Sequence, residues 1–267
     1  MTNFPDNIFG INAKEAYDKI INAPDVKPPE IKKRKSTKKP KEEEPKPQVK
    51  QPIAVNLSEY IYLPNHELYV AKQRTELKKD WYGSHRKLHE QSARMLTLRE
   101  FADFLLLLGS MSSIQGISIV ENGLGQKLAT IEREVLYHEI TDKRDPHRGE
   151  FLDAYFIDDS GNGSPNFIDF NYRSEPNGTF GPKNHELLED YVKANVRVHL
   201  KDFNRQGLPT APFIGGFGFY EPERNNVAVY EANSSWSGFN CQFDPDDIDG
   251  SIGVRFAYEK QNFRSAQ

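Results

Sequence analysis

The chain has 267 residues, a formal net charge of −4 and a single cysteine, Cys241. This length suits one large domain or two small ones, and one cysteine excludes an internal disulfide and cysteine-rich zinc sites. The longest apolar run, 104–108, is far shorter than the roughly 20 residues that span a bilayer. The N-terminus also lacks the basic start and apolar run of a secretory signal. We therefore expect a soluble cytoplasmic protein, with export by a signal-less route left open.

Residues 1–25 are predicted to form a small N-terminal unit. Residues 12–21 fit a short helix because apolar side chains recur along one face, namely Ala13, Ala16, Tyr17, Ile20 and Ile21. A helix this short cannot bury its apolar face by itself. It is therefore either a docking peptide for a second partner or a helix packed on its own domain.

Residues 26–52 are predicted to be a disordered linker. They contain nine Lys, one Arg, four Glu and six Pro, and such a segment cannot repay the entropy cost of ordering. Their net charge of +6 leaves −8 for residues 53–267. A mildly acidic body is a poor fit to duplex binding. The basic clusters at 32–35 and 38–41 indicate either weak nucleic-acid contact, nuclear import or a solvated spacer.

The body of the chain spans 53–267. Its first half is predicted to contain short strands and three helices. In chain order the patterns place these elements at 61–64, 68–71, 80–91, 97–109 and 128–141. The helix at 97–109 has the clearest boundaries. Thr97 is a good N-cap, Glu100 occupies the capping-box position and Gly109 is a suitable stop. The helix at 128–141 carries its apolar residues on one side: Ile131, Val135, Leu136 and Ile140.

The second half of the body is predicted to be richer in strands. A strand at 151–156 and a partner at 167–172 flank a turn at 159–163. A further helix is predicted within 182–202, on the pattern of Leu187, Leu188, Tyr191 and Val192. Helices early and short strands late indicate an α+β fold rather than an alternating parallel sheet.

The C-terminus carries the pattern Gly253-Val254-Arg255-Phe256-Ala257, preceded by Trp236 and Cys241. It resembles the last strand of the C-type-lectin-fold and formylglycine-generating superfamily, and in particular the variable proteins of diversity-generating retroelements. The stretches 95–101 and 149–154 are similar to further scaffold segments of these proteins. The resemblance implies a C-type-lectin-like domain with short twisted strands and two or three helices. Because the oxidase branch of the superfamily uses a pair of cysteines, Cys241 alone makes that activity a poor match.

The resemblance also implies that residues 225–249 form a segment displayed for ligand recognition. Polar loops rich in Ser, Asn and aromatic residues are typical of such surfaces, and Trp and Tyr are frequent binding hot spots. Eight residues are the predicted ligand contacts: Asn226, Tyr230, Asn233, Ser235, Trp236, Phe239, Asn240 and Gln242. For the aromatic members the competing interpretation is core packing on alternate strand faces. We expect a non-catalytic module that binds another protein.

Catalytic and metal sites are weakly indicated, and no catalytic residue is predicted. Calcium could be held by the acidic group Asp244, Asp246, Asp247 and Asp249, although an acidic surface turn explains it as well. His85 and His89 have a spacing that suits a metal, but the surrounding zinc-protease pattern is missing. Cys241 is predicted to be a small buried residue, and Arg255 to pair with a carboxylate. A metal-dependent hydrolase and a viral or cell-surface assembly protein stay open as alternatives.

Overall fold

The computed structural model describes residues 7–8, 11–12, 55–109, 119–144, 146–174 and 179–262. The chain divides into two units, Met1–Val49 and Lys50–Gln267. In the first unit, β1 (Asn7–Ile8) pairs with β2 (Ile11–Asn12) in an antiparallel hairpin. Asn12, the expected start of a helix, therefore lies in a strand. The rest of that predicted helix and the linker at 26–52 lie outside the described residues.

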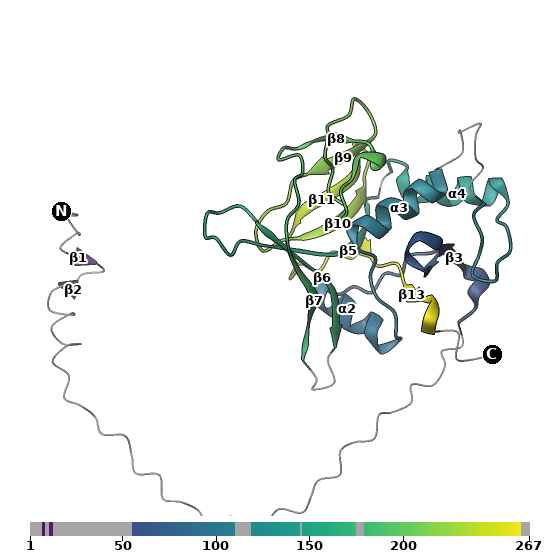
Figure 1. Ribbon diagram of the computed structural model, residues 1–267, viewed down its shortest axis with the longest axis horizontal. Coiled ribbons are helices and arrows are strands. Elements are labelled where there is room, and N and C mark those ends of the chain that lie inside the picture. The colour runs from purple at the N-terminus through teal and green to yellow at the C-terminus, as the bar shows by residue number, and fades with distance from the viewer. Residues whose placement is uncertain are drawn as a thin grey trace, which may run out of the picture. The chain divides into compact units, whose positions relative to one another are not determined.

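The second unit is an α+β body, as the sequence predicts (Figure 1). Its helices are α2 (Trp81–Glu90), α3 (Leu98–Gly109) and α4 (Thr130–Thr141), with short 3-10 turns η1 (Leu57–Glu59), η2 (Pro64–His66) and η3 (Leu200–Asp202). In the described part of the chain, no helix combines the length and the apolar character needed to cross a membrane.

An eight-stranded mixed sheet forms the centre of the body. Seven strands run in the order β7-β6-β5-β10-β11-β9-β8, and β12 pairs with β5. Their bounds are β5 (Arg148–Ile157), β6 (Phe167–Ser174), β7 (Phe180–Leu187), β8 (Val196–Val198), β9 (Phe217–Tyr220), β10 (Val227–Ala232), β11 (Ser237–Phe243) and β12 (Ile252–Gly253). The pairs β9–β11 and β5–β12 are parallel and the other neighbours are antiparallel.

A small antiparallel sheet joins the two ends of the body. It contains β3 (Tyr60–Leu63), β4 (Leu68–Ala71) and β13 (Ala257–Glu259), in the order β13-β4-β3. The strands predicted at 61–64 and 68–71 are thus confirmed. Because β13 lies near the end of the chain and pairs with β4, this sheet ties the first and last strands of the body together.

Local signals explain the start of α3. Thr97 Oγ1 accepts a hydrogen bond from the Glu100 backbone N–H at 3.3 Å, and Glu100 Oε2 accepts one from the Thr97 N–H at 2.9 Å. This reciprocal pair is the predicted capping box. The helix ends at Gly109, also as predicted. The glutamate is buried and additionally forms two hydrogen bonds with Arg94, each 2.7 Å long.

Two predictions of helical structure are wrong. The helix expected within 182–202 is replaced by β7, which is hydrogen-bonded to β6, and by a loop leading to β8. The apolar residues of α4 do not share one buried side. Leu136 and Ile140 are buried, whereas Ile131 and Val135 are 66% and 59% exposed. Tertiary strand pairing and packing decide both outcomes, and neither is visible in the local apolar pattern.

Helices cover the main sheet on both faces. On one face α3 packs onto β10 and β11, since Phe101 lies 5.0 Å from Tyr230 and 6.2 Å from Phe239 between ring centroids. On the other face α2 lies against β6, with Trp81 4.8 Å from Tyr172. Figure 1 shows α4 next to α3, and these two helices are in contact. The sheet therefore has two apolar layers, one on each side.

Candidate functional site: the polar face of β9, β10 and β11

The register of β10 and β11 decides which predicted contact residues can reach a ligand. Tyr230 is opposite Phe239, and Glu231 is opposite Gly238, while Asn240 is opposite Val229. Residues opposite one another lie on the same side of a sheet, and successive residues alternate between sides. Tyr230 and Phe239 therefore share one side. Glu231 and Asn240 share the other side.

The first of these sides is core. Tyr230 and Phe239 are 1% and 0% exposed, their ring centroids are 5.3 Å apart, and α3 covers both. Burial also raises the pKa of the Tyr230 hydroxyl. The prediction that these two aromatic residues contact a ligand is therefore contradicted, and the core-packing interpretation applies. A ligand could reach them only by displacing α3.

The second side carries a pair of partly exposed aromatic rings. Tyr220 on β9 is aligned with Asn240 on the neighbouring parallel strand β11. Its ring meets Trp236 edge to face, with centroids 5.0 Å apart and planes at 79°. Trp236 in turn lies over Gly218, where an added Cβ would come within 2.5 Å of the indole ring. The absence of a side chain at Gly218 thus leaves the space that the Trp236 indole occupies.

The turn that presents Trp236 is held by Asn233. The Asn233 Oδ1 accepts hydrogen bonds from the backbone N–H groups of Ser235 and Trp236, at 2.9 and 3.0 Å, and from the Ser235 hydroxyl at 2.8 Å. This Asx-type arrangement fixes the connection between β10 and β11. Of the predicted contact residues here, Ser235 is exposed and Trp236 is half-buried, whereas the Asn233 side-chain oxygen is used within the turn.

The remaining predicted contacts divide along the strands. Asn240 is half-buried and lies on the same side as Trp236, because it is aligned with Tyr220. Gln242 is also half-buried and lies where the register of β11 against β10 shifts. Gln242 Nε2 donates to the Glu221 carbonyl at 3.1 Å. Asn226 precedes β10, at the opposite end of that strand from Trp236, and its carbonyl accepts a hydrogen bond from the Phe156 N–H. The structure therefore does not bring Asn226 together with the Trp236 group.

A cluster of titratable side chains adjoins Asn240. Asn240 Nδ2 donates to Glu231 Oε2 at 3.4 Å, and Glu231 Oε1 lies 3.6 Å from His147 Nε2. On its other side, His147 Nδ1 is 2.9 Å from the Ser251 hydroxyl and 4.0 Å from Asp249. We call the surface formed by Tyr220, Trp236, Asn240, Glu231, His147, Asp249 and Ser251 the polar face.

Strand pairing brings these distant residues together. His147 comes immediately before β5, and Ser251 comes immediately before β12. The parallel pairing of β12 with β5 places Ile252 opposite Gly149, and the Gly149 N–H donates to the Ser251 carbonyl. Glu231 also lies opposite Gly149, through the pairing of β10 with β5. The cluster is thus a direct consequence of three strands that meet at Gly149.

The hydrogen bonds assign a proton to the His147–Glu231 contact. The Ser251 hydroxyl donates to Asp249 Oδ1 at 2.7 Å, so the serine oxygen accepts from the His147 Nδ1–H. His147 Nε2 then faces Glu231, and a favourable contact requires a proton on one of them. Burial raises the pKa of the Glu231 carboxyl, and the nearby His147 opposes this shift. The Glu231 carboxyl therefore keeps its proton more readily than an exposed glutamate does.

The same hydrogen bonds weigh against a nucleophilic serine. A general base must accept the serine proton, but the Ser251 proton is directed at Asp249 and not at His147. The Asp249 carboxylate also accepts the Ser251 backbone N–H at 2.7 Å, so the group stabilises a turn. Chemically, the arrangement supplies a carboxylate and an imidazole to a partner more readily than it supplies a nucleophile.

The calcium candidate is an acidic turn. Asp244 Oδ1 accepts the Asp246 N–H at 2.9 Å, and Asp246 and Asp247 are exposed. In the part of the chain that the structure describes, no group of three or more His, Cys, Asp or Glu side chains could hold a metal ion. The four aspartates are therefore not assembled around a common point in these residues.

The other residues singled out in the sequence are structural. His85 is fully buried, with its Nε2 3.6 Å from Asp153 and its ring 6.4 Å from that of His89. Cys241 is buried, and burial raises the pKa of its thiol, so it is not poised as a nucleophile. The predicted pairing of Arg255 with a carboxylate is confirmed. Its guanidinium donates hydrogen bonds to both Glu150 carboxylate oxygens, at 2.9 and 2.6 Å.

Comparison with known proteins adds no family to this description. A scan against protein-family models finds no match. Searches of curated proteins and of solved structures also find no match.

Proposed function

We propose that the body of this chain is a non-catalytic protein-binding module whose recognition surface is the polar face. The observation that carries the proposal is the side-by-side arrangement of the Tyr220–Trp236 ring pair and Asn240 on adjacent strands. Aromatic residues with few rotatable bonds contribute large contact areas at low entropy cost. The turn held by Asn233 also orders this surface before binding, which reduces the entropy that association costs.

The charge of the polar face defines the partner more closely. Glu231, Asp249 and His147 lie within one cluster beside Asn240. Two carboxylates with one imidazole favour a positively charged group, and a Lys or Arg side chain is the common protein source of that charge. We therefore expect a partner protein that offers a basic side chain to Asp249, beside the buried Glu231, and an apolar contact to Trp236.

We further propose that the scaffold is C-type-lectin-like. The motif that suggested this family lies in the interior: Val254, Arg255 and Ala257 are buried, and Arg255 is bonded to Glu150. A scaffold of this kind is supported by the position of the displayed residues on strands and short turns of a rigid sheet. The proposal extends the α+β description and rests on the resemblance of residues 253–257.

The proposal is tested by comparing capture of partners by the full chain and by surface variants. Trp236→Ala should weaken binding at least about tenfold, because a central aromatic contact is typically worth 2 kcal/mol or more. Phe213→Ala is a matched control, since Phe213 is an exposed aromatic residue outside the polar face. Capture is quantified by mass spectrometry, and the dissociation constant is then measured with the purified partner.

Folding must be shown to be intact for both variants by thermal unfolding. If Trp236→Ala and Phe213→Ala capture every protein as the parent does, the polar face is not the recognition surface. A partner retained by Phe213→Ala and lost by Trp236→Ala supports the proposal. Its dependence on a basic side chain is then checked by replacing exposed Lys and Arg residues of that partner with Gln.

A further inference from the structure

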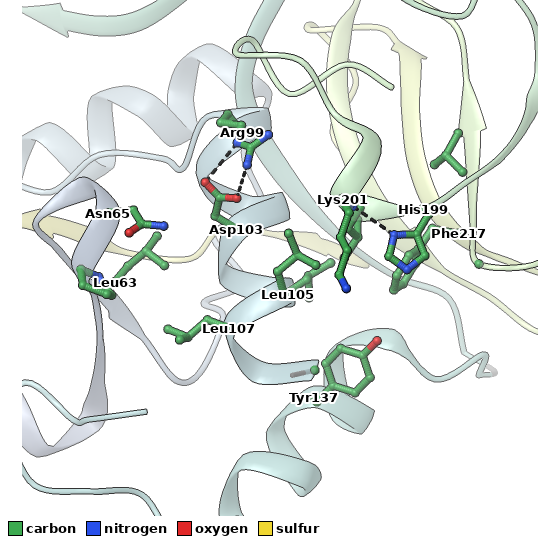
Figure 2. Close-up of a pocket in the computed structure, with 16 residues that line it drawn as sticks. Leu63, Asn65, Arg99, Asp103, Leu105, Leu107, Tyr137, His199, Lys201 and Phe217 are labelled. Atoms are coloured by element: carbon green, nitrogen blue, oxygen red, sulfur yellow. Dashed lines mark hydrogen bonds and ion pairs between the residues drawn. The ribbon is translucent and has the colours of Figure 1, made fainter. Parts of the chain in front are cut away.

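A cavity lies along α3, on the side of the sheet that this helix covers. Its volume is about 880 Å³, and its walls come from η2, α3, α4, β8, η3 and the start of β9. Figure 2 shows Leu63 and Asn65 on one side of α3, Lys201 and Phe217 on the other, and Tyr137 beyond the end of the helix. Pockets for small ligands are typically 300–1,000 Å³. The cavity is therefore large enough for a small organic molecule.

The floor of the cavity is apolar. Leu105 and Leu106 of α3, Leu200 of η3 and Phe217 of β9 all line it. Leu105 and Leu200 belong to the buried core, whereas Leu106 and Phe217 are only partly buried and pack against that core. An apolar floor that continues the core favours a ligand with a hydrocarbon body, because burial of such a body removes apolar surface from water.

The charged groups in one wall already neutralise each other. Arg99 donates two hydrogen bonds to Asp103, at 3.1 and 2.6 Å, and its remaining nitrogen donates to the carbonyls of Phe203 and Asn204. Asp103 Oδ2, which accepts one of these bonds, also contacts His66 Nε2 at 2.8 Å. Burial opposes ionisation of Asp103, but His66 and Arg99 overcome this and lower its pKa. This wall is thus a closed network with no charge left for a ligand.

The other end of the cavity carries unused donors. Lys201 is exposed and takes part in none of the ion pairs formed among the described residues. His199 Nδ1 accepts the Lys201 backbone N–H at 3.1 Å, so the proton of the neutral imidazole is on Nε2 and makes that atom a donor. Figure 2 shows the Lys201 side chain extending toward the side where Tyr137 lies. An ammonium group and an imidazole N–H at the edge of an apolar floor together suit an anionic head group.

We propose that this cavity binds an amphipathic monocarboxylate of the medium-chain fatty-acid class. The carboxylate contacts Lys201 and His199, and the hydrocarbon chain lies on Leu105, Leu106 and Phe217. The cavity lies on the face covered by α3 and shares no residue with the polar face. Carboxylate binding can therefore be tested independently of the proposed protein recognition.

The test is calorimetric titration of the full chain with octanoate, octylamine and acetate. Octanoate should bind saturably at one site. Octylamine, which has the same chain and the opposite charge, should bind at least about tenfold more weakly. Acetate, which has the head group alone, should show no saturable binding. Lys201→Gln should weaken octanoate about tenfold, while Lys183→Gln, the same change at an exposed lysine of β7, should leave it unaltered.

A second variant tests the apolar part of the site. Leu106→Asp places a charge on the floor of the cavity and should abolish octanoate binding, and its fold is checked by circular dichroism. If Leu106→Asp does not fold, Lys201→Gln alone decides, because it changes an exposed side chain. The proposal is overturned by any of three results: no octanoate binding at millimolar concentration, equal binding of octylamine, or equal effects of Lys201→Gln and Lys183→Gln.

Discussion

The two sides of β10 and β11 differ near Trp236, although both sides also carry buried apolar residues. On one side Tyr230 and Phe239 pack under α3 and are almost fully buried. On the other, Asn240 donates to Glu231, and Glu231 faces His147 where β5 begins. The resemblance of the C-terminus, together with composition, implied that the whole of 225–249 is displayed. The comparison shows that a strand contributes only every second residue to a binding surface.

The buried carboxylates of the body extend this comparison. Glu150 lies on the α3 side, where Arg255 satisfies both of its oxygens. Glu231 lies on the polar side, where Asn240 and His147 are longer contacts. Burial opposes ionisation of Glu150, but the Arg255 guanidinium overcomes this and lowers its pKa, whereas burial raises the pKa of Glu231. The two environments therefore shift the two carboxyl groups in opposite directions.

The largest difference between the two sides is expected from truncating adjacent residues of β11. Phe239→Ala should lower the free energy of unfolding by about 3–5 kcal/mol, because it opens a cavity beneath α3. Asn240→Ala should lower it by less than about 1 kcal/mol, since it removes partly exposed hydrogen bonds. Urea denaturation of both variants at pH 7 measures the difference. Equal losses would contradict the assignment of the two residues to different sides of the sheet.

A second effect is expected where α2 covers the side of the sheet that carries Asp153. Asp153 is completely buried, and its Oδ2 accepts the Asn171 N–H at 2.9 Å. Burial raises its pKa to about 8, against the effect of Arg94. A raised acid pKa gives stability that is present below the unfolded value, near 3.8, and is lost as the pH rises through about 8. Asp153→Asn should therefore be more stable than the parent at pH 8, by about 2–4 kcal/mol.

The measurement for Asp153→Asn is urea unfolding at pH 5 and at pH 8. The advantage of the variant should be larger at pH 8, because only the parent then has to ionise a buried carboxyl group. His85 lies 3.6 Å away and is present in both proteins, so Asp153→Asn is also compared in a His85→Gln background. Asp247→Asn, at an exposed position, serves as the control. An advantage that does not change with pH would show that Asp153 is not protonated by the fold.

Much of the fold follows from local signals in the sequence. Thr97 and Glu100 locate the start of α3, and the turn at 159–163 separates the paired strands β5 and β6, all as predicted. β7 shows where such signals fail. Its Leu187, with Leu188 and Tyr191, has helical spacing, but the strand is fixed by hydrogen bonds to β6. Those hydrogen bonds join segments that are separate in the sequence, so the local preferences of the residues do not predict them.

The candidate site was predictable only in part for the same reason. The sequence indicated Trp236 and Asn240, which do share one side of the sheet. Glu231, an acidic residue in an otherwise apolar strand, was a signal that could have been used. His147 was not accessible to such reasoning, because it reaches Glu231 only through the pairing of β5 with β10. Long-range strand order decides which polar residues meet.

The smallest and most specific effect concerns the Glu231 carboxyl. Because burial raises the Glu231 pKa, its contribution to stability is present below the unfolded pKa and is lost as the pH rises through the folded one. Glu231→Gln should therefore gain stability relative to the parent as the pH rises above the unfolded value. Glu150→Gln should show the opposite slope. Because the pKa of Glu150 is lowered, ionised Glu150 stabilises the parent fully above the unfolded pKa. This stabilisation is lost as the pH falls through the folded pKa. Urea unfolding at pH 4, 5 and 8 measures both slopes. Parallel slopes would mean that the two carboxylates have the same environment, and the distinction between the α3 side and the polar side would then fail.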